Sequence, residues 1–87
     1  MLGTDPTIQA TTFGALLRRL RQKSGLTQEQ LAFEAGLQRN YVSNMELGQY
    51  QPTITTLFKI AYALKVAPSA IVLELERELA AASVNKR

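Results

Sequence analysis

Apolar residues recur along most of the chain at the spacing of amphipathic helices, and no segment alternates convincingly as a strand. Around Leu16 and again around Ile60, apolar residues stand at i, i+3, i+4 and i+7, which gathers them on one helix face. The pattern predicts five helices, over residues 12–23, 27–35, 39–47 and 53–64 and from residue 68 onward. We therefore expect an all-α fold.

Capping residues mark the expected helix ends. Thr27 and Gln30 have the spacing of a capping box, in which each side chain bonds the other's backbone N–H. Thr53 stands before the fourth helix as an N-cap, and Pro68 suits the first position of the fifth. Three glycines stand where helices should stop: Gly25, Gly36 and Gly48.

The chain length of 87 residues suits one domain. We expect a flexible N-terminal arm over residues 1–10, the folded domain over residues 11–73, and an extension of the last helix with a frayed tail over residues 74–87.

Composition removes several kinds of chemistry. The chain has no cysteine and no histidine, which excludes disulfides, thiolate zinc sites and the commonest general base. Its carboxylates stand without a paired acid or a nucleophile, so we expect no enzyme activity, no metal site and no cofactor. It contains no apolar run long enough for a membrane span and no signal-peptide pattern. We expect a cytoplasmic protein with no membrane partner and no evident small-molecule ligand.

The net charge of +3 lies entirely in residues 1–65, because residues 66–87 carry equal numbers of acidic and basic side chains. A basic face is typical of proteins with a polyanionic partner, although a charge of this size is weak evidence by itself.

Two short helices and a tight turn stand out between residues 28 and 47. Gly36 allows the chain to reverse sharply, and the small side chain of Ala32 allows the two helices to approach closely. Val42 and Met45 supply the apolar underside of the second helix. This combination predicts a helix-turn-helix.

The opposite face of that second helix is polar. At 100° per residue, Arg39, Asn40, Ser43 and Asn44 share one side of the wheel. Arginine pairs with guanine and asparagine with adenine through two hydrogen bonds in the DNA major groove, which makes Arg39, Asn40 and Asn44 candidates for base reading. A short polar helix face is usually an ordinary solvated surface, and it is the geometry of Ala32, Gly36 and Val42 that favours DNA reading here.

The same residues resemble the phage repressor/Cro helix-turn-helix family, also called the XRE family, over residues 13–73. The segment from Leu31 to Gly48 looks most similar to restriction–modification controller proteins and to small prophage or plasmid repressors. The matching residues are Phe13-Gly14, Leu17, Leu20-Arg21, Gly25 to Glu29, Leu31-Ala32, Ala35 to Leu37, Tyr41 to Ser43, Glu46, Gly48, Pro52-Thr53, Leu57, Ile60-Ala61, Ala63-Leu64 and Val66.

The resemblance implies a compact five-helix, lambda-repressor-like bundle with the helix-turn-helix at its second and third helices. It implies a sequence-specific binder of double-stranded DNA that regulates transcription, as a repressor or autoregulatory controller of bacterial, phage or plasmid origin, bound to the nucleoid. It also implies an ion pair between Arg21 and Glu46 that ties the first helix to the end of the third. Contacts to the DNA backbone are expected from Thr27, Gln28, Gln38, Tyr41, Ser43, Gln49 and Thr53.

The chain departs from the family pattern at several positions. Residues 49–51 carry no Lys or Arg, where relatives often have one. Phe33 replaces a residue that is often polar, and we interpret it as core in preference to an interaction patch. Ala67 replaces the usual Ser or Thr cap before the last helix.

The last helix is apolar on two sides, which favours a homodimer on a pseudo-palindromic site. The expected interface residues are Leu73, Ala80 and Val84, with Lys59 and Tyr62 as an alternative surface. The main alternative function is a helical protein-interaction module, such as an antitoxin-like partner of another protein.

Overall fold

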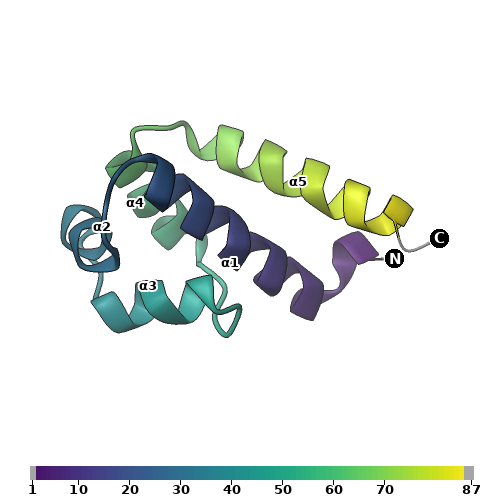
Figure 1. Cartoon of the computed structure of the whole chain (residues 1–87), viewed down its shortest axis with the longest axis horizontal. Helices are drawn as coiled ribbons and strands as arrows, with labels where there is room; N and C mark the ends of the chain where they lie inside the picture. Colours follow the sequence, from purple (N-terminus) through teal and green to yellow (C-terminus); the bar gives the residue numbers. More distant parts are fainter. Residues whose placement is uncertain (1, 86–87) are drawn as a thin grey trace.

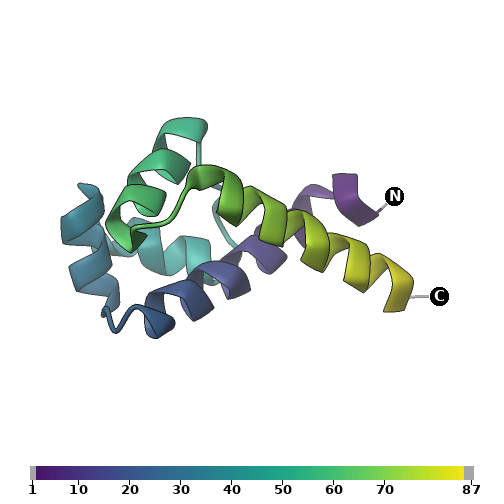
Figure 2. The same cartoon turned by 90° about the horizontal axis from the view of Figure 1, so that it is seen from above.

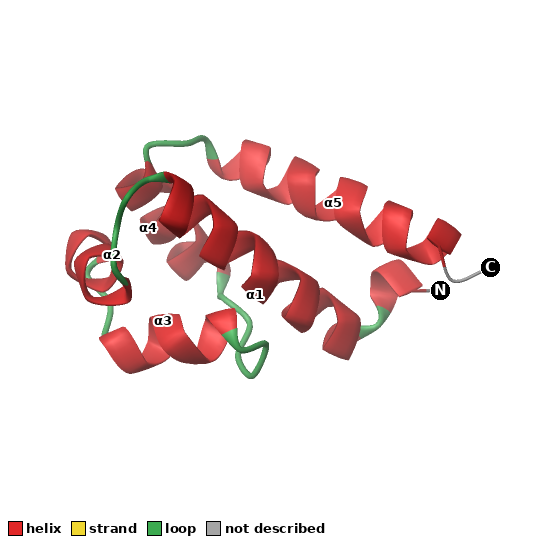
Figure 3. Ribbon diagram, in the orientation of Figure 1, coloured by secondary structure: helices red, strands yellow, loops and turns green. Residues whose placement is uncertain are grey.

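The computed structural model describes residues 2–85, and these residues form helices joined by short loops, with no strand among them (Figure 3). The expected all-α fold with five α-helices is therefore confirmed. A 3-10 helix, η1 (Leu2–Thr4), precedes α1 (Pro6–Lys23), α2 (Gln28–Ala35), α3 (Arg39–Glu46), α4 (Ile54–Leu64) and α5 (Pro68–Asn85).

The five helices surround one core. In Figure 1, α3 lies along the lower edge, α1 crosses the centre and α5 lies above it. Figure 2, seen from above, places α4 on the side of the molecule opposite α1. The largest fully buried side chains come from α1 to α4: Leu16, Leu17, Leu31, Val42, Met45 and Ile60.

The start of α1 differs from the sequence prediction. We expected a flexible arm over residues 1–10 and a helix from residue 12, but the helix begins at Pro6. Asp5 is its N-cap, and the carboxylate accepts hydrogen bonds from the backbone N–H groups of Thr7, at 2.8 Å, and Ile8, at 3.2 Å. An acidic N-cap followed by proline is a strong helix start, so residues 6–10 form the first turns of α1.

The buried face of α5 is also rotated from the one expected. The sequence predicted a buried stripe of Val72, Leu75, Leu79 and Ala82. In the structure Ile71 and Leu79 are buried and Val72 is exposed. An ion pair between Arg19 and Glu78 joins this face to α1. Periodicity alone did not reveal which of two adjacent apolar residues, at positions 71 and 72, faces the core.

At Gly14 the helices α1 and α3 approach each other closely. A Cβ atom at this position would lie 2.7 Å from the backbone carbonyl oxygen of Glu46, which is closer than real Cβ atoms approach other atoms. The missing side chain therefore allows α3 to lie directly against α1.

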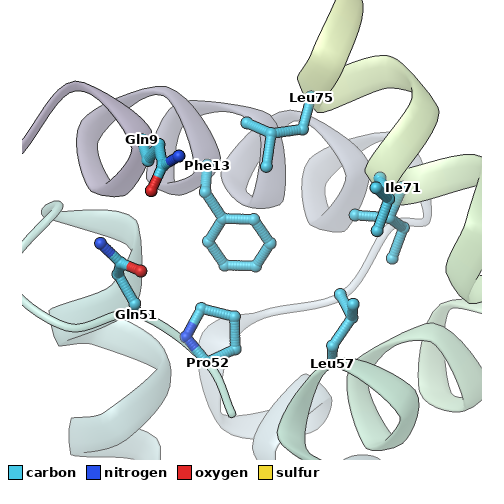
Figure 4. A pocket seen from close by; sticks show the side chains of 8 residues that line it. Gln9, Phe13, Gln51, Pro52, Leu57, Ile71 and Leu75 are labelled. Atoms are coloured by element: carbon cyan, nitrogen blue, oxygen red, sulfur yellow. The ribbon is translucent and has the colours of Figure 1, made fainter. Parts of the chain in front are cut away.

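A small, mostly apolar cavity of about 240 Å³ lies where α1, α4, α5 and the loop between α3 and α4 meet. Figure 4 shows the ring of Phe13 among the side chains that line it. Nearby, the side-chain amide of Gln51 donates a hydrogen bond of 3.0 Å to the backbone carbonyl of Pro6. The first turn of α1, which the sequence prediction missed, thus helps to hold the loop that follows α3.

Among residues 2–85, no single helix is both long and apolar enough to cross a bilayer. By length and composition, α4 and α5 qualify only as a pair, and the pair is bent by 105°.

Candidate nucleic-acid interface

The turn between α2 and α3 has the geometry that the sequence predicts. Gly36 ends α2 with a φ of 68° and a ψ of 36°, in the left-handed region where glycine is not strained. The backbone N–H of Leu37 donates to the carbonyl of Ala32 at 2.8 Å, which closes the turn. No atom lies within 4 Å of a Cβ built at Gly36. The position therefore favours glycine because of its backbone conformation and not because of a lack of space.

Beneath the turn, α2 and α3 pack through small and apolar side chains. Ala32 on α2 is buried, as are Val42 and Met45 on α3. These residues fix one face of α3 in the core. The opposite face of α3 is therefore directed toward the solvent.

The outer face of α3 carries the predicted base-reading residues. Arg39 and Asn40 are exposed at the N-terminal end of the helix, while Ser43 and Asn44 are half-buried one turn later. Since residues 39–46 are α-helical, these side chains share one side of α3. Arginine and asparagine on a helix start of this kind can donate to and accept from base edges in a major groove.

A polar network joins α1, α2 and the end of α3 around one carboxylate. Arg21 donates to Glu46 from Nε, at 2.6 Å, and from Nη2, at 3.1 Å. It also donates from Nη1 to the backbone carbonyl of Leu26 at 2.9 Å. The side chains of Arg21 and Glu46 are only 12% and 4% exposed. The structure thus contains the ion pair that the sequence resemblance implies.

Hydrogen bonding to Glu46 raises the pKa of the Arg21 guanidinium above its usual value, while burial acts in the opposite direction. The arginine therefore stays charged. The pair is a charge-assisted contact with two hydrogen bonds, and it holds the C-terminal end of α3 against α1.

Gln28 belongs to the same network, which the sequence did not predict. Its Nε2 donates to Oε1 of Glu46 at 3.0 Å, across 18 positions of sequence. One hydrogen of that amide group is committed to the carboxylate, and the second remains available as a donor. The expected backbone-contacting residue is thus held in one orientation by the end of α3.

The start of α2 is capped as predicted. The Thr27 hydroxyl accepts from the backbone N–H of Gln30 at 3.0 Å, and the Gln30 side chain accepts from the backbone N–H of Thr27 at 2.9 Å. A shallow groove runs from this helix start to the start of α3; its lining residues are Arg21, Gly25, Leu26, Thr27, Gln28, Glu29 and Arg39. Arg39 therefore shares a groove with two of the residues expected to contact the DNA backbone.

The remaining predicted backbone contacts surround α3. Gln38, at the N-cap position of α3, and Gln49, in the loop after the helix, are exposed. Tyr41 is half-buried, with its ring centroid 6.0 Å from that of Tyr50 in the loop. Thr53 is the N-cap of α4, as predicted, and its hydroxyl accepts from the backbone N–H of Thr56 at 3.1 Å.

The sequence analysis also assigned packing roles to Phe33 and to residues of α5, which lie away from α3. The interpretation of Phe33 as core is wrong: its side chain is 82% exposed, because Leu31, Ala32 and Ala35 form the buried side of α2. In α5, Leu73 is 46% exposed and Ala80 is exposed, and the side chain of Val84 lies outside the described residues.

Within residues 2–85, no group of three or more acidic side chains is arranged to hold a metal ion. The chemistry of the site is hydrogen bonding by amides, hydroxyls and one exposed guanidinium.

Comparisons with known proteins agree with this geometry. A family model described as "Helix-turn-helix" matches residues 17–71. An uncharacterized HTH-type transcriptional regulator of Sinorhizobium fredii is 41% identical over 54 residues, which cover 62% of this chain and 70% of the relative.

Two solved structures extend the similarity. The restriction–modification controller protein C.AhdI of Aeromonas hydrophila is 42% identical, with a TM-score of 0.69 over 71% of this chain and 94% of the other. A variant of the controller protein C.Esp1396I, bound to its highest-affinity operator site, is 27% identical, with a TM-score of 0.75 over 82% of this chain and 93% of the other. The chain therefore belongs to the helix-turn-helix family of DNA-binding transcription regulators, in the repressor/Cro-like (XRE) group that its sequence resembles.

Proposed function

We propose that α3 lies in the major groove of its DNA site and reads bases through Arg39, Asn40 and Asn44. The observation that carries this proposal is the contrast between the two faces of α3. Val42 and Met45 are fully buried, while on the opposite side of the same helix Arg39 and Asn40 are exposed and Asn44 is half-buried. A reading helix needs both properties, since its polar groups must be held at fixed positions to discriminate between bases.

Contacts to the DNA backbone come from the residues that border α3. The groove at the start of α2 accepts one phosphate, with Thr27 and Gln28 beside it and the helix start favouring the negative charge. Gln38, Tyr41, Ser43, Gln49 and Thr53 complete the set around α3. Since residues 49–51 carry no Lys or Arg, we expect affinity to fall less steeply with salt than in a protein with a basic loop.

The protein acts as a dimer on a pseudo-palindromic operator and regulates transcription by occupying it, as a repressor or autoregulatory controller in the cytoplasm. The support is the similarity to controller proteins, one of which is described bound to an operator site. In a two-fold dimer the two α3 helices would be about 34 Å apart, one turn of the DNA helix.

A helical protein-interaction module is the second candidate function, and the exposed ring of Phe33 is the observation in its favour. It is the weaker candidate, because it leaves the polar outer face of α3 without a role. The similar proteins described above are regulators rather than enzymes, and no catalytic role is proposed for this chain.

Selection from a random library of double-stranded DNA at near-physiological salt tests the function. The control is the triple variant Arg39→Ala, Asn40→Ala, Asn44→Ala, whose substitutions remove polar atoms only from the outer face of α3. We expect the wild type to enrich a two-fold-related motif and the folded triple variant to enrich none. Enrichment of the same motif by both proteins would reject the site residues. No enrichment by folded wild-type protein would favour the interaction module.

A further inference from the structure

The loop between α3 and α4 is held against the start of α1 on both sides of Gln49. Before it, Gly48 packs on Thr11, and a Cβ atom built at Gly48 would lie 2.8 Å from the Thr11 methyl group. After it, the side-chain amide of Gln51 donates a hydrogen bond of 3.0 Å to the backbone carbonyl of Pro6. Figure 1 shows this loop beside the first turns of α1. These contacts therefore enclose a residue that is expected to contact the DNA backbone.

The same loop is also tied to α3. The backbone N–H of Gln49 donates to the carbonyl of Asn44 at 2.9 Å. On the side of α1, the Thr11 hydroxyl donates to the backbone carbonyls of Thr7 and Ile8, at 3.1 Å and 3.2 Å, which fixes the methyl group that faces the loop. Gln49 is thus held between two helices.

The contacts on α1 depend on its first turns, which Asp5 stabilises. The carboxylate of Asp5 caps the helix, and Pro6 is its first residue. The helix-turn-helix family model begins only at residue 17. The support of the loop therefore comes from a part of the chain that the family model does not match.

A loop without charge needs such a support more than a basic loop does. Residues 49–51 carry no Lys or Arg, so their contacts to phosphate are hydrogen bonds from neutral groups. A hydrogen bond of this kind weakens steeply when donor and acceptor are poorly aligned. A loop that is mobile before binding must also be ordered on the DNA, which reduces affinity. Contacts that order the loop in advance remove that cost.

We propose that the capped start of α1 is a positioning element for DNA binding, which holds Gln49 where it contacts the DNA backbone. Asp5, Thr11 and Gln51 are its positioning residues. This inference rests on the proposed function, and it adds to that function a role for residues outside the interface. Because the loop contacts phosphates and not bases, the support contributes equally to binding of every DNA sequence.

Amide hydrogen exchange of the free protein, measured by NMR, tests the support itself. Gln51→Met removes the donor at similar length, and Asp5→Ala removes the cap. The control is Asp5→Ser, which loses the same charge but keeps a capping side chain. We expect Gln51→Met and Asp5→Ala to speed exchange at the Gln49 N–H about five-fold, the effect of losing one hydrogen bond. Asp5→Ser should stay within about two-fold of the wild type. The N–H of Leu37, in the turn between α2 and α3, should keep its rate.

Binding to the selected DNA site and to its single-base variants tests the role in recognition. We expect Asp5→Ala to bind about 3- to 10-fold more weakly than Asp5→Ser, by the same factor on every sequence, because a side chain must then be ordered on binding. Combining Asp5→Ala with Gln51→Met should weaken binding by less than about two-fold further, since both changes remove the same support.

Unchanged exchange at Gln49, equal affinities of Asp5→Ala and Asp5→Ser, or additive losses in the double variant would each overturn the proposal. Additive losses would instead make Gln51 a DNA contact in its own right. Failure of the wild type to select any DNA motif would reject the proposed function, whereas failure of these variants to differ would reject only the positioning role of α1.

Discussion

α3 and α4 both bury one face in the same core, but their outer faces differ in chemistry. The outer face of α3 carries Arg39, Asn40 and Asn44, whereas that of α4 carries an aliphatic residue and two aromatic residues. A polar face gains most binding free energy from a partner that offers hydrogen-bonding groups at fixed positions. An apolar face gains most from a partner that excludes water from it. Two helices of one small domain thus suit two different partners.

The two helices also differ in how they are held. α4 has a threonine cap and a broad apolar inner face. α3 is only eight residues long and depends on close contact at Gly14 and on the Arg21–Glu46 pair. Substitutions at these contacts should therefore disturb α3 while leaving the exposed face of α4, with Ile54, Phe58 and Tyr62, in place.

The largest expected effect comes from Glu46→Ala. Removing the carboxylate leaves Arg21 charged in a mostly buried position, and breaking a buried pair in this way costs about 3–5 kcal/mol of the free energy of unfolding. Urea denaturation measures this loss. The control is Glu34→Ala, an exposed position on α2, which should change the same quantity by less than about 0.5 kcal/mol. Equal effects of the two substitutions would show that the pair does not anchor α3.

The next effect is that of Gly14→Ala. The new methyl group would collide with the backbone of α3, so we expect a loss of roughly 1–3 kcal/mol in the free energy of unfolding. At an open helix position the same change would stabilise the protein by about 1 kcal/mol, which makes the sign of the result informative. Thermal melting of the variant measures this effect. The control is Gly3→Ala, because a Cβ atom at that position would have no neighbour within 4 Å. A higher melting temperature for Gly14→Ala would contradict the close approach of α1 and α3.

The smallest expected effect is that of Phe33→Gln. Because this side chain is 82% exposed, the free energy of unfolding should change by less than about 0.5 kcal/mol. Urea denaturation again measures it. A loss of 3 kcal/mol or more, as for a buried phenylalanine, would restore the interpretation of Phe33 as core.

Features determined by neighbouring residues were predictable from the sequence. The capping box of Thr27, the cap at Thr53 and the turn at Gly36 each depend on a few adjacent positions, and the structure contains all three. The start of α1 was missed although the sequence carries its signal, an aspartate followed by a proline.

Features that depend on how the helices pack were harder to predict from the sequence. The hydrogen bond between Gln28 and Glu46 joins residues far apart in the sequence, and nothing local signals it. The exposure of Phe33 follows from which side of α2 meets the core, and Ile71 and Val72 differ for the same reason on α5.

The most direct test of base reading by α3 measures binding of wild-type protein and Arg39→Ala to the selected site and to each of its single-base variants. If Arg39 reads a base, the substitution costs roughly 1–3 kcal/mol on the selected site, removes discrimination at one base pair and leaves nonspecific affinity nearly unchanged. A loss of equal size on every sequence would contradict base reading and would make Arg39 a phosphate contact in the groove beside Thr27 and Gln28.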